Sequence, residues 1–286
     1  MRYLNLSKNN SQQIFTYKIA DSDYQSNQRI DLFKCWIKNN STNTTNTPIV
    51  AQYSASSNLY QDHTYIGEKS YDLSVDAIEP TGYLLKTKNQ SFQLDQNCIH
   101  CNLDCIDTAL LFGPVLILNL AMNRVFCLHA SAFKIKGKVF ILMGDSGTGK
   151  STVARFMSEQ ANSTRLADDI LPLKISNDEI TVLPNFPQLK LPVDKQYKGK
   201  KIVGEIVLLF AQKSNNETAL SPVDTFYAIK NMIKHSVATK LFANNELQNH
   251  LSFCHQVSSR VKNYRLYYQH SANSLEQLYN VLNELN

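Results

Sequence analysis

The chain has 286 residues, of which 43% are hydrophobic and 19% are charged, which suits a globular protein of one large or two modest domains. Its 29 basic and 24 acidic residues leave a net charge of +5, a mild and dispersed excess that does not indicate nucleic acid binding. The N-terminal sequence lacks an apolar block of signal-peptide length, and the uncharged run 108–123 is too short to cross a bilayer. We therefore expect a soluble, cytoplasmic protein that binds neither membranes nor nucleic acid.

The six cysteines are expected to be reduced thiols, because no secretory signal accompanies them. Cys98, Cys101 and Cys105, with His100 among them, have part of the spacing of a zinc site. No second pair of ligands completes four at a usual spacing, so we do not predict structural zinc.

Residues 1–104 are predicted to form a small β-rich module. Asn, Ser, Gly and Asp turns separate its short aromatic or β-branched runs, and the polar segment 39–48 is expected to be an exposed loop. The apolar spacing from Asp104 to Met122 favours a helix that is interrupted or begins near Gly113 and Pro114. The predicted strands lie within 13–20, 29–38, 47–55, 64–75, 82–88 and 91–96.

Residues 105–286 are predicted to form an α/β domain with a mixed sheet and flanking helices. Ser221 before Pro222 is predicted to start one of its helices, because serine caps exposed amide groups and proline tolerates the first turn. The other predicted elements are strands at 124–135 and 138–144 with a turn at 136–138, a helix at 150–161, strands at 165–175 and 179–187, a buried strand within 201–213, helices at 223–235 and 246–261, a strand at 264–269 and a helix at 274–285.

The segment "GDSGTGKST" follows a hydrophobic strand and opens a helix. Its GxxxxGK[ST] spacing is typical of a loop that wraps a polyphosphate with backbone amide groups. Lys150 is expected to reach the β and γ phosphates of ATP, and the Ser151 hydroxyl to bind Mg²⁺. The predicted nucleotide-binding residues are Gly144, Asp145, Ser146, Gly147, Thr148, Gly149, Lys150, Ser151 and Thr152.

Two carboxylates and a histidine flank this loop in the sequence. Asp168 and Asp169 are candidates for taking a hydroxyl proton and holding Mg²⁺, or else form a solvated strand end. Adjacent residues on an extended strand point to opposite faces, so both serve one site only where the strand bends or ends. His129 lies in an apolar strand, where a histidine is a core residue more often than a catalytic one.

Read together, "LHASAF", "GDSGTGKST" and "LADDI" resemble the catalytic domain of HPr serine kinase/phosphorylase, and more closely the shorter HPr-kinase-related proteins. The resemblance covers roughly residues 108–286 and implies a P-loop kinase fold that can form oligomers. It makes His129, Lys150 and Asp169 the active-site trio, in which Asp169 is the general base, His129 supports it and Ser151 binds Mg²⁺. Asp168, its neighbour, is then a further Mg²⁺ ligand.

The sequence also departs from that family. Thr152 stands where the HPr kinases have glutamate, and their second signature, a Gly- and Asn-containing loop with a metal-binding glutamate, has no counterpart. Residues 1–104 do not resemble their regulatory domain. HPr itself is therefore not the expected substrate.

The resulting expectation is an ATP- and Mg²⁺-dependent kinase that phosphorylates a Ser or Thr hydroxyl of a protein or peptide. A kinase for small-molecule hydroxyls and a nucleotide-gated binding protein without transfer activity remain as alternatives. The segment 184–201, rich in proline and lysine, is the candidate acceptor-binding surface, or else only a solvated basic loop.

Overall fold

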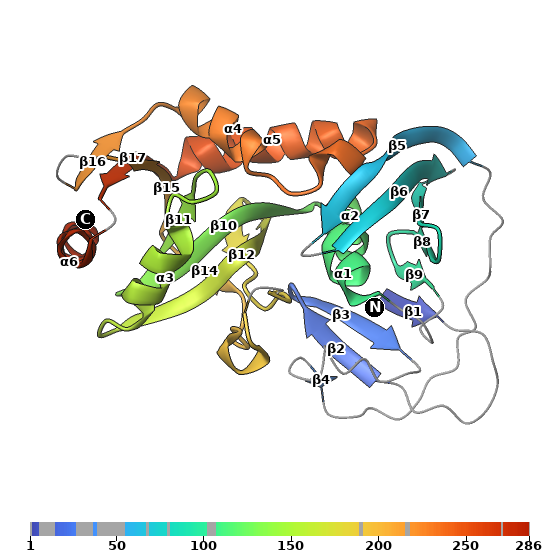
Figure 1. Ribbon diagram of the computed structural model, residues 1–286, viewed down its shortest axis with the longest axis horizontal. Coiled ribbons are helices and arrows are strands. Elements are labelled where there is room, and N and C mark those ends of the chain that lie inside the picture. Colours follow the sequence, from blue (N-terminus) through green and yellow to red (C-terminus); the bar gives the residue numbers. More distant parts are fainter. Residues whose placement is uncertain are drawn as a thin grey trace. The chain divides into compact units, whose positions relative to one another are not determined.

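The computed structural model describes residues 2–5, 15–26, 37–38, 55–66, 69–78, 81–101, 107–188, 191–214, 218–269 and 271–285. The predicted loop at 39–48 and nearly all of the predicted strand at 47–55 lie outside these residues. The chain divides into two compact units, each with its own sheet (Figure 1). The first comprises Met1–Val125 and Ala238–Leu247, and the second Phe126–Val237 and Gln248–Asn286. Within the described residues, no helix has the length and apolar character needed to cross a membrane.

The first unit contains a sheet of nine strands among the residues described. Phe92 and Leu94 are buried whereas Ser91 is exposed, the alternation expected of a sheet with one face on the core. Neighbouring strands run antiparallel, except that β1 is parallel to both β3 and β9. In spatial order the strands are β4 (Ile37–Lys38), β2 (Phe15–Ile19), β3 (Ser22–Ser26), β1 (Arg2–Asn5), β9 (Cys98–His100), β8 (Ser91–Leu94), β7 (Gly82–Lys86), β6 (Lys69–Ile78) and β5 (Ala55–Ile66).

A helical segment follows this sheet in the chain and belongs to the same unit. It comprises α1 (Thr108–Leu110), a π-helical turn (Leu111–Val115) and α2 (Leu116–Met122). The predicted interruption is confirmed, because Gly113 has non-helical angles (φ −86°, ψ −112°) and Pro114 follows it. The segment is buried along its length from Leu110 to Met122, as expected of a helix that is apolar on every side.

The division between the units differs from the predicted boundary at residues 104 and 105. The helical segment clusters with the first unit, where the fully buried Asn119 accepts a hydrogen bond from the Tyr24 hydroxyl (3.1 Å) and donates one to Asp95 O (2.7 Å). Residues 238–247 cluster there too, including the 3-10 turn Thr239–Leu241 and the first residues of α5 (Asn244–Arg260). These contacts join residues far apart in the sequence, and composition does not reveal them.

The second unit contains a mixed sheet of eight strands among the described residues, as predicted for this part of the chain. The central strands β11, β15 and β17 run parallel, and β11 and β15 are almost continuously apolar, as strands covered on both faces are. In spatial order the strands are β14 (Ile202–Val203), β13 (Glu179–Val182), β12 (Ser163–Ser176), β10 (Val125–Ile135), β11 (Lys138–Met143), β15 (Ile206–Lys213), β17 (Lys262–Tyr268) and β16 (Ala219–Pro222).

Helices cover both faces of the second sheet (Figure 1). The helices α3 (Lys150–Ser158) and α6 (Ala272–Glu284) contribute to one buried cluster that includes Leu209 of β15. The next residue, Phe210, points to the other face, where its ring meets the edge of Tyr227 on α4 (Thr225–Lys234). On α5, Phe253 packs against Phe126 of β10.

Two predicted hairpins are confirmed, whereas one predicted helix start is wrong. Turns at 136–137 and 177–178 join β10 to β11 and β12 to β13. Ser221 and Pro222 instead end β16, an edge strand, where a proline is tolerated because one side needs no amide donor. The helix α4 begins after Asp224, whose Oδ1 accepts a hydrogen bond from the Tyr227 amide (2.7 Å).

Candidate functional site

The loop between β11 and α3 lies at the carboxyl end of a parallel strand, where ligands of open α/β sheets bind. Gly147 and Gly149 adopt φ of +77° and +81°, values that side chains rarely allow. A Cβ on Gly144 would lie 2.9 Å from the backbone oxygen of Ala211 on β15, so only glycine fits there. The three glycines that predicted a phosphate loop therefore each have a backbone reason in the fold.

The first turn of α3 has no side-chain cap. Its N-cap residue is Gly149, which has no side chain to cap the helix. The initial amide groups of a helix carry partial positive charge and point away from it, which is the arrangement that binds phosphate. Ser151 and Thr152 are exposed in this turn, which places the predicted metal-binding hydroxyl of Ser151 where an ion could reach it.

Lys150 folds back over the loop. Its side chain is largely buried, and Nζ donates to the backbone oxygens of Gly144 (2.7 Å) and Asp145 (3.1 Å). The Thr148 hydroxyl also donates to Asp145 O (2.8 Å), and the Tyr268 hydroxyl on β17 donates to Thr148 O. The loop is thus held in shape by its own side chains and by a neighbouring strand.

Asp145 in the loop pairs with Lys234, the last residue of α4. The two side chains are exposed and their charged atoms are 2.5 Å apart. The hydrogen bond from Lys234 lowers the pKa of the Asp145 carboxyl. No sequence pattern places Lys234 at the loop, because the pairing depends on where α4 ends against the sheet.

His129 and Asp169 come together across β10 and β12. His129 Nε2 lies 3.5 Å from Asp169 Oδ1, with side-chain exposures of 43% and 15%. Partial exposure of both groups leaves them accessible to a substrate, and a carboxylate next to an imidazole can accept a proton while the ring fixes its position. This geometry disfavours the interpretation of His129 as a buried core residue.

Asp168 is more buried, at 7% exposure, and both of its carboxylate oxygens have partners. Oδ1 accepts a hydrogen bond from Ser131 Oγ (2.9 Å), and Oδ2 forms an ion pair with Arg165. A metal ion at Asp168 would share an oxygen with Ser131 or Arg165, or would displace one of them. The alternative of a solvated acidic strand end does not describe this residue.

The two aspartates reach the same neighbouring strand because β12 is bent where they lie. The amide groups of Asp168, Asp169 and Ile170 all donate to Gln188 Oε1, at 3.1, 3.1 and 3.3 Å. Successive amide groups of a straight strand point in alternate directions and could not meet at one oxygen. The bend that a shared site for the two aspartates needs is therefore present. The sequence did not indicate that Gln188 binds the backbone of this bend.

His235 links the loop to the histidine–aspartate pair. Its carbonyl oxygen accepts a hydrogen bond from the His129 amide (2.7 Å), and its ring lies within electrostatic range of Asp145 and Lys150. Burial lowers the pKa of His235 to about 4, and the charge of Lys234 acts in the same direction. The ring is therefore neutral at pH 7, adding no charge between the loop and the pair.

The two ends of the predicted acceptor-binding segment differ in solvent exposure. Residues 184–188 are buried, whereas most of 192–201 is exposed, including Lys195, Lys198 and Lys200. Leu189 and Lys190 lie outside the described residues. Gln196 ties the exposed part to the buried part by accepting from the Gln188 amide (3.1 Å) and donating to the Gln188 carbonyl (3.1 Å).

The other sequence candidates do not add to this site. No cluster of three or more potential metal ligands occurs among the described residues, which exclude Cys105. Burial raises the pKa of the Cys98 thiol to about 12, which keeps it protonated.

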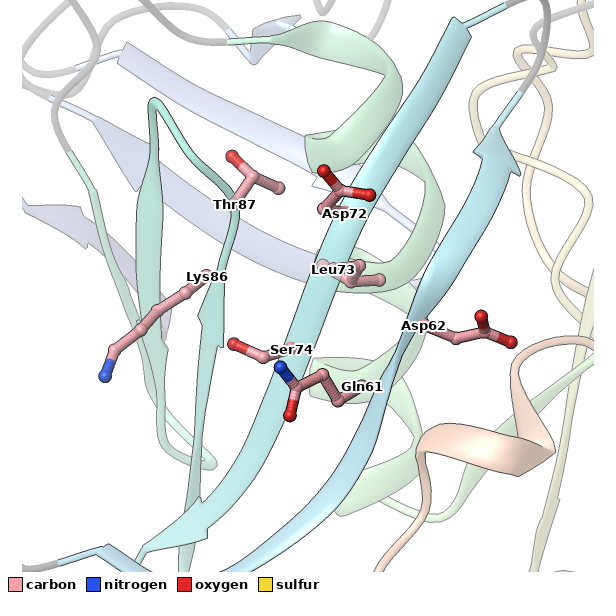
Figure 2. Close-up of a pocket in the computed structure, with 7 residues that line it drawn as sticks. All are labelled: Gln61, Asp62, Asp72, Leu73, Ser74, Lys86 and Thr87. Carbon is pink, nitrogen blue, oxygen red and sulfur yellow. The ribbon is translucent and has the colours of Figure 1, made fainter.

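Two hollows lie on the sheet of the first unit. One of about 380 Å³ is shown in Figure 2, where the charged ends of Asp62 and Lys86 project to opposite sides. The other, of about 660 Å³, lies beside it and is lined by residues of β6, the β7–β8 turn and the start of α1. Neither hollow includes a predicted site residue, and the groups around the first do not converge on a common point.

No protein-family model matches this chain, and no curated protein matches it. Among solved structures, the HPr(Ser) kinase/phosphatase from Coxiella burnetii is similar at a TM-score of 0.30 and 9% sequence identity. The similarity covers 55% of this chain and 93% of that chain.

Proposed function

We propose that this protein is an ATP- and Mg²⁺-dependent kinase that transfers the γ-phosphoryl group to a Ser or Thr hydroxyl of a protein or peptide. The observation that carries the proposal is the end of α4, where Lys234 pairs with Asp145 of the loop and the next residue, His235, accepts a hydrogen bond from the His129 amide. A loop suited to phosphate and a carboxylate suited to accept a proton thus belong to one neighbourhood. The resemblance of "LHASAF", "GDSGTGKST" and "LADDI" to HPr-kinase-related proteins supports the same reaction.

The phosphate-binding part of the site is the loop and the start of α3. Its amide groups and Lys150 bind the β and γ phosphates and neutralise charge as the bond between the γ phosphorus and the leaving ADP oxygen breaks. Ser151 is exposed and fits a Mg²⁺ ion, whereas an ion at Asp168 would have to share an oxygen with Arg165 or Ser131, or displace one of them. When bound, Mg²⁺ supplies further neutralisation of phosphate charge.

Asp169 is the general base of the proposed reaction. It takes the proton of the acceptor hydroxyl while that oxygen forms the new bond to phosphorus. His129 holds the carboxylate in position from 3.5 Å. The exposed lysines of 192–201 are the proposed contact for the acceptor.

The proposal is tested by transfer of γ-labelled phosphate from ATP into a size-fractionated lysate of the source organism. Wild type is compared with Asp169→Asn, Lys150→Ala and, as a matched carboxylate control, Asp178→Asn in the β12–β13 turn. We expect wild type and Asp178→Asn to label a protein or peptide band, Asp169→Asn to bind ATP without transfer, and Lys150→Ala to bind ATP weakly.

Three outcomes contradict the proposal. Label that enters only small molecules makes the protein a metabolite kinase. Full transfer by Asp169→Asn shows that Asp169 is not the general base. Wild type that binds Mg²⁺-ATP without transfer to any fraction favours a nucleotide-gated binding protein.

A further inference from the structure

We propose that Gln188 is a positioning residue for the proposed phosphoryl transfer, because it sets the bend that directs Asp169 toward His129. This inference rests on the proposed function for its catalytic meaning. The geometry on which it depends is independent of that function and can be tested separately.

The Gln188 side chain binds five backbone groups. Gln188 Oε1 accepts from the three amides of 168–170, and Nε2 donates to the carbonyl oxygens of Ile170 (2.7 Å) and Phe186 (3.2 Å). Gln188 is only 2% exposed, so water does not replace these bonds. Buried backbone groups left without partners are costly, which makes the bent conformation dependent on this side chain.

The two carboxylates of 168–169 contact residues on one face of β10. His129 and Ser131 are two residues apart on β10 and therefore lie on the same face of that strand. Asp169 contacts His129 and Asp168 contacts Ser131, although the two aspartates are adjacent in the chain. A straight β12 would send one of the aspartates to the opposite face, so both contacts require the bend.

Glutamine suits position 188 because its side chain both donates and accepts hydrogen bonds. The side chain must offer an accepting oxygen to three amides and a donating nitrogen to two carbonyls. Methionine has a similar length and neither capacity, and glutamate lacks the donors and adds charge beside two carboxylates. Gln196 fixes Gln188 in turn through the Gln188 amide and carbonyl groups.

The test uses the full chain with ¹⁵N-labelled histidine and follows the ring resonances of His129. Wild type, Gln188→Met, Asp169→Asn and the double variant are compared. Gln160→Met is the control, because the Gln160 side chain donates to Phe156 O on α3, outside the bend in β12. We expect Gln188→Met to move the His129 resonances toward those of Asp169→Asn, and to have little further effect in the double variant. Gln160→Met should match wild type.

The kinetic readout uses the acceptor found by the labelling experiment. We expect kcat of Gln188→Met to fall about 10- to 100-fold with KM for ATP within about twofold, because the base is misplaced while the phosphate loop is intact. If wild type transfers no phosphate, the proposed function fails while the His129 resonances still test the positioning by Gln188.

Unchanged His129 resonances in folded Gln188→Met overturn the inference, as does an equal shift in the Asp169→Asn background. If Gln188→Met does not fold, Gln196→Met replaces it, because Gln196 is partly exposed and acts on the bend through Gln188. It should move the resonances in the same direction by a smaller amount. The absence of any shift in that variant also overturns the inference.

Discussion

At the scale of single residues, Tyr83 and Glu246 form a buried polar pair in the first unit. The Tyr83 hydroxyl donates to Glu246 Oε2 (2.6 Å) and accepts from the Ala243 amide (2.9 Å). The exposures are 2% and 8%, and burial, followed by the hydrogen bond and charge of Glu246, raises the pKa of Tyr83. The pair ties residues 243–246 to β7 within that unit.

Tyr83→Phe should destabilise the protein by about 2–3 kcal/mol, because it leaves a buried carboxylate and an amide without this partner. Urea unfolding measures the loss. Tyr197→Phe, which removes a hydroxyl in a largely exposed segment, should cost less than about 0.5 kcal/mol. Equal costs for the two substitutions would show that the buried pair contributes no more than an exposed hydroxyl.

Two glycines of the phosphate loop should respond differently to alanine. Gly144→Ala places a Cβ 2.9 Å from Ala211 O, a backbone atom of a central strand that cannot move away. Gly147→Ala meets nothing within 4 Å and incurs only the cost of its φ of +77°, about 1–2 kcal/mol. Urea midpoints should therefore fall further for Gly144→Ala, and the reverse order would contradict this account of the loop.

At the scale of elements, the start of α4 provides a direct test of the corrected helix boundary. Asp224→Ala should destabilise the second unit by about 1 kcal/mol because the Tyr227 amide loses its cap. Ser221→Ala, in the exposed edge strand β16, should change stability by less than about 0.5 kcal/mol. Thermal unfolding distinguishes the two, and a larger effect at Ser221 would restore the sequence-based start.

The elements that the sequence predicted well are those determined by neighbouring residues. The turns at 136–137 and 177–178, the interruption at Gly113 and the loop before α3 all follow from local backbone preferences. The start of α4 was misplaced because two capping residues lie close together and only the pairing of β16 with β17 selects between them. The bend in β12 depends on Gln188, about twenty residues away, and no local pattern marks it.

The same distinction applies to the candidate site. The sequence motifs predicted His129, Lys150 and Asp169 as site residues. They did not predict that His235 and Lys234 lie near the loop. Both stand at the end of α4, and their place near the loop follows from packing of that helix on the sheet. Neither residue type, in that sequence context, indicates a phosphate site.

At the scale of the whole molecule, two buried histidines should make stability depend on pH. Burial lowers the pKa of both His235 and His250 to about 4, whereas an unfolded histidine titrates near 6.5. Between these values the unfolded chain binds more protons, so stability is complete above pH 6.5 and falls as pH drops toward 4. Each histidine adds up to about 1.4 kcal/mol per pH unit to this slope.

His250→Gln should reduce the pH dependence of the urea midpoint between pH 6.5 and 4, because it removes one of these groups. His255→Gln is the matched control, since His255 is exposed on the same helix. The slope of this control should equal that of wild type. An unchanged slope in folded His250→Gln would mean that this histidine is not buried as a neutral ring.

The bond from Tyr268 to Thr148 has a consequence for the order of folding. It joins residues 120 positions apart, so the phosphate loop gains this support only after the chain through β17 has assembled. Local turns such as 136–137 can form long before such a distant contact. In a refolding experiment, recovery of the proposed ATP binding should therefore lag behind recovery of far-ultraviolet circular dichroism. Tyr268→Phe should leave the early phase unchanged while it weakens the final binding.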